Sequence, residues 1–104
     1  MAIRVGITLL AVLAAGLAQA APDAQGLAKA NGCLACHNVN IRIVGPAYRD
    51  VAKKYRGDAG AAARLMKKVR HGGKGVWGNV PMPPQTKPSD ADLKAIIAWV
   101  LSQK

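Results

Sequence analysis

The only two cysteines of this 104-residue chain stand three positions apart and are followed at once by a histidine, in the run Cys33-Leu34-Ala35-Cys36-His37. Two thiols about one helical turn apart can each add to a vinyl group of a haem, and the adjacent imidazole can then coordinate the iron. Such covalent bonds prevent loss of the cofactor outside the cell. The motif therefore predicts one c-type haem attached through Cys33 and Cys36, with His37 as an axial ligand.

Three other interpretations of the cysteine pair have less support. A redox disulfide of the thioredoxin type needs a preceding strand in a βαβ setting, which the helical pattern of this chain does not offer. A zinc site would need a fourth ligand, and the only other histidine, His71, has no partner at the spacing of a zinc finger. A purely structural disulfide would leave the thin core of so small a chain unexplained.

The sixth ligand of the iron decides the chemistry, because an open position would favour ligand binding or catalysis over electron transfer. The candidates are Met66, Met82, His71 and the lysines. Met66 has the apolar spacing of a helix face and is expected in the core. Met82 stands among prolines in the segment 80–84, and these restrict the backbone and reduce the entropy lost when a weak thioether ligand is held in place. The sequence therefore favours Met82.

The domain that must position these residues is preceded by a segment of a different kind. Residues 3–21 are nearly all apolar, with one cation, Arg4, and a small-residue ending at 18–20 that fits a signal-peptidase site. We interpret residues 1–20 as a cleaved signal peptide and residues 21–104 as the working domain. An uncleaved membrane anchor is the alternative, but the apolar run is short for a spanning helix and no cluster of cations follows it.

The mature domain is too small to be stable on side-chain packing alone. Removal of 20 residues leaves 84, and a domain of this size has difficulty burying enough apolar surface to offset its chain entropy without a staple, metal or cofactor. The chain contains no Phe, and its large aromatic residues are Tyr48, Tyr55, Trp77 and Trp99. A haem would supply the missing apolar mass.

Four short helices and no strand are predicted for this domain. They are expected at 24–31, capped by Asp23 and ended by Gly32; at 46–55, ended by Gly57; from Asp58 to the Gly72-Gly73 pair; and from Ser89, paired with Asp92, to the C-terminus. The apolar faces of the last two helices are expected to hold Ala62, Leu65, Met66 and Val69, and Leu93, Ile96, Ile97 and Val100. The segments 38–45 and 72–88 are predicted loops, and the second carries Trp77 and Met82.

The charge of the chain indicates the kind of partner it meets. Without Arg4 the domain carries 14 Lys and Arg against 5 Asp and Glu. Such a balance suits an acidic protein, an anionic membrane surface or nucleic acid. Export, and the lack of a basic run with interleaved aromatics, argue against nucleic acid. We therefore expect a monomer that meets acidic protein partners, with at most transient membrane contact.

Motifs spread over the whole domain resemble the short bacterial class I cytochromes c, periplasmic donors of electrons to nitrite reductase and oxidases. In chain order the matching segments are the Cys33 to His37 motif, Gly45-Pro46-Ala47-Tyr48, Gly75-Val76-Trp77-Gly78, Pro81-Met82-Pro83-Pro84 and Ala98-Trp99-Val100-Leu101. The resemblance implies the all-α class I cytochrome c fold, with about four short helices wrapped around one covalently attached haem c.

The resemblance also implies roles for individual residues. Thioether bonds form at Cys33 and Cys36, and the axial ligands of the iron are His37 and Met82. The Pro46 carbonyl would accept a hydrogen bond from the outer nitrogen of His37, and the Trp77 indole N–H would reach a haem propionate. Helix initiation by Pro46 and plain packing of Trp77 are the alternatives for these two residues.

The sequence departs from the family pattern behind the axial methionine. The family often has an asparagine three residues after it, which hydrogen-bonds in that region, and this chain has Gln85 there. His71 stands where the family has a neutral polar residue, and we expect it to be exposed at the end of its helix. The sequence therefore does not decide whether Gln85 makes the hydrogen bond that asparagine makes in the family.

These features predict a periplasmic single-electron carrier and not an enzyme. With His37 and Met82 on the iron, no substrate binds without displacing Met82, so electrons leave through the haem edge. We expect electrons to pass from a membrane quinol-side complex to a terminal reductase or oxidase. Docking is expected at an apolar rim of Leu34, Ala35, Ile43, Val44, Val80, Pro81, Pro83 and Pro84, where nearby cations would steer an acidic partner.

Two other functions are compatible with the motif. One is a haem enzyme or gas sensor in which Met82 is labile or does not bind the iron. The other is a structural or sensory subunit in which the haem serves mainly as a folding nucleus. Strong binding of cyanide or carbon monoxide would favour the first, and rapid electron exchange by the isolated chain would count against the second.

Overall fold

The structure, a computed structural model, describes residues 2–3, 5–6 and 23–104. The predicted signal peptide, residues 1–20, lies outside the described residues apart from four positions near its start. Its cleavage and the domain boundary therefore stay predictions. Among the described residues, no helix combines the length and the apolar character that crossing a membrane requires.

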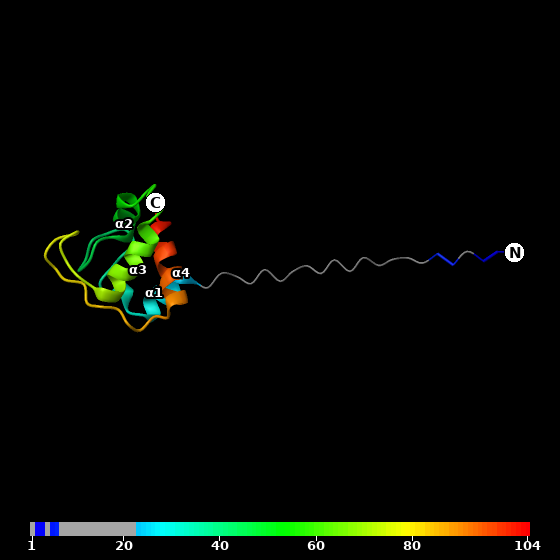
Figure 1. Cartoon of the computed structure of the whole chain (residues 1–104), viewed down its shortest axis with the longest axis horizontal. Coiled ribbons are helices and arrows are strands. Elements are labelled where there is room, and N and C mark those ends of the chain that lie inside the picture. The colour runs from blue at the N-terminus through cyan, green and yellow to red at the C-terminus, as the bar shows by residue number, and fades with distance from the viewer. Residues whose placement is uncertain (1, 4, 7–22) are drawn as a thin grey trace.

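The described domain consists of short helices joined by long loops (Figure 1). In chain order the helices are α1 (Ala24–Ala30), the 3-10 helix η1 (Cys33–Ala35), α2 (Tyr48–Lys54), α3 (Ala61–His71) and α4 (Asp90–Leu101). Residues 23–104 contain no strand, and two segments pair only in an isolated bridge between Gly73 and Met82. The predicted all-α fold with four short α-helices is confirmed.

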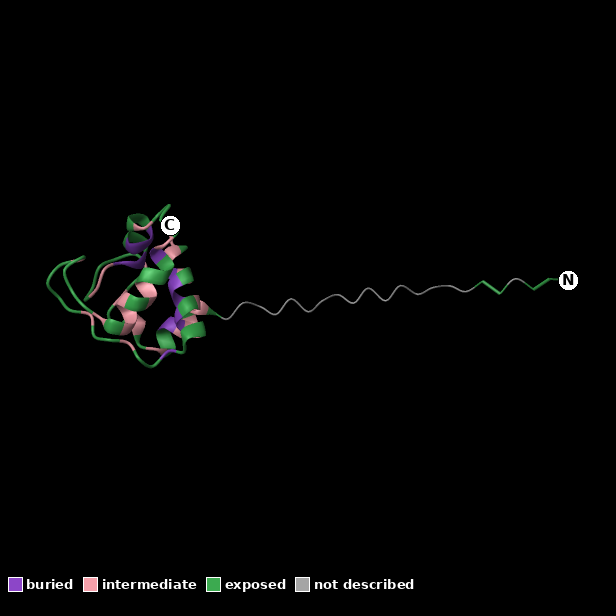
Figure 2. Cartoon of the chain, in the orientation of Figure 1, coloured by how far each residue is buried: buried purple, intermediate pink, exposed green. Residues whose placement is uncertain are grey.

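Helix α4 is the centre of the domain, because α1, α2 and α3 all pack against it. Its four predicted core positions, Leu93, Ile96, Ile97 and Val100, are all buried. Figure 2 shows the buried side of α4 turned toward the other helices. The apolar spacing of this segment therefore predicted its packing correctly.

Two of the helices begin later than the sequence predicts. Helix α2 starts at Tyr48 and not at Pro46, because Ala47 still has an extended backbone with φ −61° and ψ 138°. Helix α3 starts at Ala61 after Gly60, so Asp58 is not its cap. The Asp58 carboxylate accepts a hydrogen bond from the Gly60 N–H and pairs with Arg64, and the Arg64 hydrogen bond lowers the pKa of this carboxyl.

The remaining local predictions concern the two ends of α1 and the apolar face of α3. Asp23 precedes α1 as predicted, but its side chain makes no capping hydrogen bond. In α3, Leu65, Met66 and Val69 are half-buried as predicted, whereas Ala62 is exposed and the buried alanine is Ala61. Gly32 lies between α1 and η1 with φ 78°, a conformation that glycine adopts without strain, and it therefore ends α1 as expected.

The cap of α4 gives a test of the fold. The Ser89 hydroxyl accepts a hydrogen bond from the Asp92 N–H over 3.1 Å, which satisfies one free donor of the first turn. We expect Ser89→Ala to lower the free energy of unfolding of the haem-loaded protein by about 1 kcal/mol. Ser89→Asp, which keeps an acceptor at the cap, should stay close to the wild type. Denaturant titration measures both variants, and equal losses would contradict the role of the cap.

Candidate functional site

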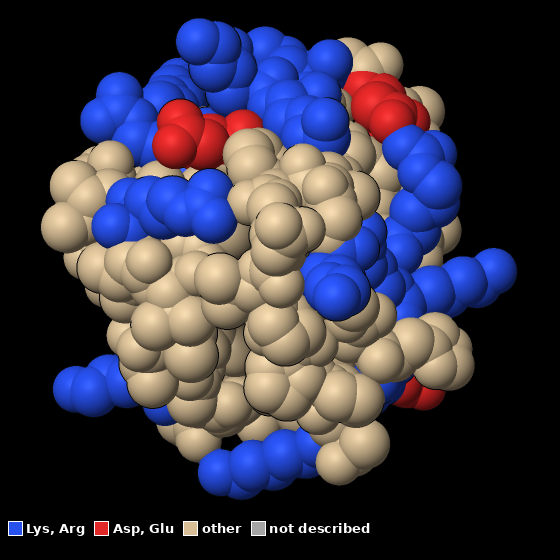
Figure 3. Space-filling view, turned by 90° about the vertical axis from the view of Figure 1, so that its left-hand side faces the viewer, with Lys and Arg blue, Asp and Glu red and all other residues tan. Residues whose placement is uncertain are grey.

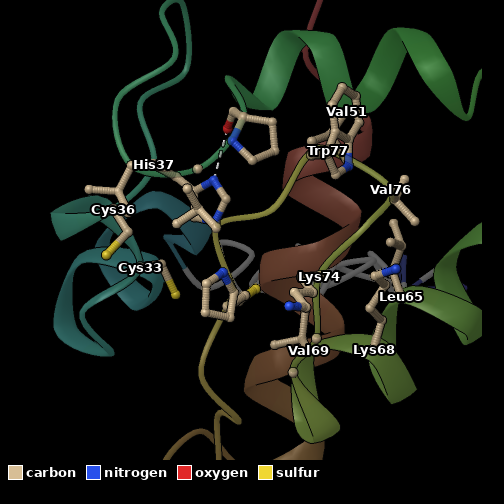
Figure 4. A pocket seen from close by; sticks show the side chains of 18 of the residues that line it. Cys33, Cys36, His37, Val51, Leu65, Lys68, Val69, Lys74, Val76 and Trp77 are labelled. Carbon is tan, nitrogen blue, oxygen red and sulfur yellow. Dashed lines mark hydrogen bonds between the residues drawn. The ribbon is translucent and has the colours of Figure 1, made fainter.

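A large cavity opens beside α4, with an empty volume of about 1160 Å³ that includes space open to solvent. Its walls come from the 33–48 segment, from α2, α3 and α4, and from the 72–83 segment (Figure 4). Six of its lining residues are buried: Tyr48, Val51, Leu93, Ile96, Ile97 and Val100. The other buried residues of the described chain are alanines and Pro88. The wall of this cavity is thus also the hydrophobic core of the domain.

Cys33, Cys36 and His37 lie together on one side of this cavity (Figure 4). η1 spans Cys33–Ala35, and the two thiols are free, Cys36 exposed and Cys33 partly buried. Burial raises the pKa of the Cys33 thiol. Within the described residues, no three His, Cys, Asp or Glu side chains are grouped so as to hold a metal ion. The ligand set that the zinc interpretation needs is therefore not assembled there.

The His37 ring is fixed on several sides. Its Nδ1 lies 2.8 Å from the Pro46 carbonyl oxygen, and with Nδ1 as the donor, Nε2 is left with a lone pair that can coordinate a metal. The ring stacks on Tyr48, with 4.8 Å between ring centroids. A Cβ added to Gly45 would lie 2.4 Å from Cε1 of the same ring. Only glycine at position 45 allows this close approach.

Tyr48 extends this support into the core. Its ring meets Trp99 edge-on, with 5.5 Å between centroids, so the imidazole rests on an aromatic pair anchored in α2 and α4. Burial and the neighbouring Cys33 thiol raise the pKa of the Tyr48 hydroxyl. Tyr48 is therefore neutral at physiological pH and serves as packing for His37.

Met82 lines the same cavity as His37, whereas Met66 and His71 are not among its lining residues. The backbone of Met82 forms two hydrogen bonds with that of Gly73. The Met82 N–H donates to the Gly73 carbonyl oxygen over 2.9 Å, and the Gly73 N–H donates to the Met82 carbonyl oxygen over 3.0 Å. Gly72, with φ 70°, lies so close that an added Cβ would stand 2.4 Å from the Met82 carbonyl oxygen. The end of α3 thus fixes where Met82 enters the cavity.

Cations gather at Trp77 on the wall of the cavity. Arg42, Lys68 and Lys74 line it, and no Asp or Glu does. Arg42 Nη2 donates to the Trp77 carbonyl oxygen over 2.9 Å, and Lys54 Nζ lies 5.7 Å from the centroid of a Trp77 ring. Sequence reasoning missed Arg42, because its contact joins residues 35 positions apart.

The residues present fit a haem. Six larger buried side chains, one Tyr and five aliphatic residues, form part of the cavity wall, which suits a flat apolar ring. Two thiols stand at its edge beside an imidazole with a free Nε2, and a thioether lines the same space. Arg42, Lys68 and Lys74 would face the carboxylates that a haem carries.

Comparisons with known proteins agree with this fit. A family model described as Cytochrome c matches residues 21–104. The chain is 57% identical over 75 residues to cytochrome c-551 of Allochromatium vinosum, covering 72% of this chain and 80% of the relative. It is 49% identical over 100 residues to cytochrome c-551 of Pseudomonas aeruginosa, covering 92% and 95%.

A solved structure gives the same result for the fold. The crystal structure of wild-type cytochrome c552 of Nitrosomonas europaea superposes with a TM-score of 0.74 at 49% sequence identity. The match covers 77% of this chain and 99% of that chain.

Gly72 tolerates a side chain less well than another glycine with positive φ. Gly72 has φ 70° and ψ −171°, and Gly57 also has a positive φ, of 80°, but an added Cβ there meets nothing within 4 Å. We expect Gly57→Ala to cost about 1 kcal/mol of unfolding free energy, and Gly72→Ala roughly 3 kcal/mol, because its Cβ must also displace the Met82 backbone. Denaturant unfolding of the haem-loaded variants measures the difference. Equal costs would show that the contact with Met82 does not limit position 72.

Proposed function

Since this chain belongs to the cytochrome c family, we propose that it is a periplasmic single-electron carrier whose haem iron is held by His37 and Met82. Membership as a short class I monohaem cytochrome c brings one covalent c-type haem, and the iron of this haem takes up and releases one electron at a time. The proposal concerns what the residues of this chain do for that group. Cys33 and Cys36 hold it through thioether bonds.

The observation that carries the proposal is the placement of Met82. Its side chain lines the cavity that His37 also lines, and two backbone hydrogen bonds to Gly73 fix the chain at this residue. A thioether is a weak ligand, so it competes for iron only when the protein holds it in place. With His37 and Met82 both on the iron, no position would remain open for a substrate, which would favour electron transfer over catalysis.

The surrounding residues orient the ligands and balance charge. The Pro46 carbonyl holds Nδ1 of His37, which fixes the ring and raises the basicity of Nε2. The cavity wall includes Trp77 and three cations, Arg42, Lys68 and Lys74. These cations would compensate the negative charge of the carboxylates of the cofactor. Residues 1–20 direct export to the periplasm and are then removed.

Partner docking is proposed at the apolar rim defined by residues 34–35, 43–44, 80–81 and 83–84. All of its members are exposed except Leu34, which is half-buried. The structure adds two exposed neighbours in the same loops, Ile41 and Val76. Figure 3 shows one face of the molecule, on which a broad area of uncharged side chains is surrounded mainly by Lys and Arg and by a few Asp. An apolar centre with a basic border suits a redox protein with an acidic rim around an apolar patch.

The basic charge is concentrated in one part of the chain, residues 42–74, which we call the basic half. It holds ten Lys and Arg against two Asp, whereas the rest of the described domain, 23–41 and 75–104, holds four against three. This half includes α2, α3 and the cations that line the cavity. The asymmetry orients the carrier toward acidic partners, such as a quinol-side complex on one side and a terminal reductase or oxidase on the other.

An optical spectrum of the oxidised, haem-loaded protein tests the ligation. We expect the weak far-red band that reports methionine sulfur on ferric haem iron. Met82→Ala should abolish this band, and Met66→Ala, the matched control in α3, should leave it unchanged. If the wild type lacks the band while the haem stays covalently bound, the electron-carrier proposal with Met82 fails, and a haem enzyme or gas sensor with an open iron becomes the better explanation.

The charge asymmetry gives a kinetic prediction. Oxidation of the reduced protein by anionic hexacyanoferrate(III) should become faster as the ionic strength falls. Removing two charges of the basic half that do not line the cavity, in Lys53→Gln/Lys67→Gln, should slow this reaction about threefold at low salt. The double variant Lys94→Gln/Lys104→Gln changes the net charge equally and should slow it less. Stopped-flow measurements of the rate at several ionic strengths test this prediction. Equal effects of the two double variants would show that the position of the charge does not matter and would contradict steering by the basic half.

A further inference from the structure

The segment that follows Met82 has few backbone groups that can donate hydrogen bonds to the rest of the protein. Pro83 and Pro84 have no backbone N–H, so neither can donate a hydrogen bond. The next donor along the chain is Gln85, and its backbone N–H donates to the Val69 carbonyl oxygen over 3.0 Å. Gln85 is therefore the first anchor of the chain on the C-terminal side of Met82.

Gln85 makes two further contacts. Its side-chain Nε2 donates to the Pro83 carbonyl oxygen over 2.9 Å, which stiffens the two-proline stretch. Its own carbonyl oxygen accepts a hydrogen bond from Arg70 Nη1 over 3.2 Å. Gln85 occupies the position where the family often has asparagine. Its side-chain amide thus donates a hydrogen bond to the backbone next to Met82.

Arg70 connects this anchor to two helices. It belongs to α3, and its second terminal nitrogen, Nη2, donates to Oδ1 of Asp90 over 2.7 Å, in the first turn of α4. Its side chain is only 24% exposed, whereas that of Asp90 is 91% exposed. A planar guanidinium can bond two acceptors at once in a fixed geometry, which an ammonium group cannot do. We call the set of Arg70, Gln85 and Asp90 the Arg70 bridge.

We propose that the Arg70 bridge is a positioning device for the axial methionine, which sets how readily Met82 is displaced from the iron. The inference rests on the proposed function, because it requires Met82 to be the ligand. Gly73 fixes Met82 from one side, and Gln85 fixes the chain three residues later. Any competing ligand must move this stretch outward, so the free energy that holds Gln85 to α3 and α4 adds to the stability of the iron–sulfur bond.

Arg70 differs from Lys67 and Lys68, the two lysines of the same helix. Lys68 lines the cavity, where it faces the cofactor. Lys67 is exposed, and no hydrogen bond or ion pair of its side chain is found among the described residues. Arg70 alone of these three is bonded to the backbone of the segment that carries Met82. Lys67 therefore provides a control with the same charge on the same helix.

Displacement of Met82 by imidazole measures the effect directly. Imidazole is titrated into the oxidised, haem-loaded protein, and the loss of the far-red band gives its apparent affinity. We expect Arg70→Gln to raise this affinity about fivefold or more and Gln85→Ala to raise it about threefold, whereas Lys67→Gln should stay within twofold of the wild type. Arg70→Lys keeps the charge but lacks the planar guanidinium, and it replaces Arg70→Gln in the experiment if that variant does not fold. It should raise the affinity for imidazole at least about threefold.

The outcomes separate the two proposals. If the wild type lacks the far-red band, the ligation by Met82 fails and the bridge has no ligand to position. If the band is present and the Arg70 and Gln85 variants bind imidazole like the wild type, the inference is overturned while the electron-carrier proposal stands. A lowered unfolding midpoint with unchanged imidazole affinity would likewise reduce the bridge to a general structural contact.

Discussion

The structure depends on one constraint: its larger buried apolar side chains pack against each other and at the same time form the wall of a cavity. Every buried apolar residue larger than alanine in α2 and α4 also lines that cavity. A domain of this size gains little stability from packing alone, so the cofactor that fills the cavity completes the core. We therefore expect binding and folding to be coupled, and the proposed covalent bonds at Cys33 and Cys36 would make the core permanent.

Around this core, the two proposed axial ligands are held by different means. His37 follows a short 3-10 helix and is fixed by the Pro46 carbonyl, the Tyr48 ring and the close approach of Gly45. Met82 stands in a loop without regular structure, so backbone pairing with Gly73 and the contacts of Gln85 fix it instead. The stronger ligand sits beside the attachment site, and the weaker one depends on long-range contacts.

Electrostatics connects the site to the surface. The cations that line the cavity, Arg42, Lys68 and Lys74, all belong to the basic half. The same positive charge can compensate carboxylates of the cofactor inside and attract acidic proteins outside. Salt screens the outer interaction more strongly than the inner one, so partner binding can be transient while the cofactor stays fixed.

The sequence by itself determined the attachment motif, the all-α fold, the buried face of α4 and Met82 as a ligand candidate, because these follow from local spacing and from proline and glycine chemistry. Local rules misplaced the starts of α2 and α3 by two or three residues, since the backbone at Ala47 and the turn at Asp58 depend on neighbouring contacts. Only the tertiary structure decided the contacts Arg42–Trp77, Gly73–Met82 and Arg70–Gln85–Asp90. These hydrogen bonds join residues far apart in the chain, and their geometry exists only after the helices have packed around the cavity.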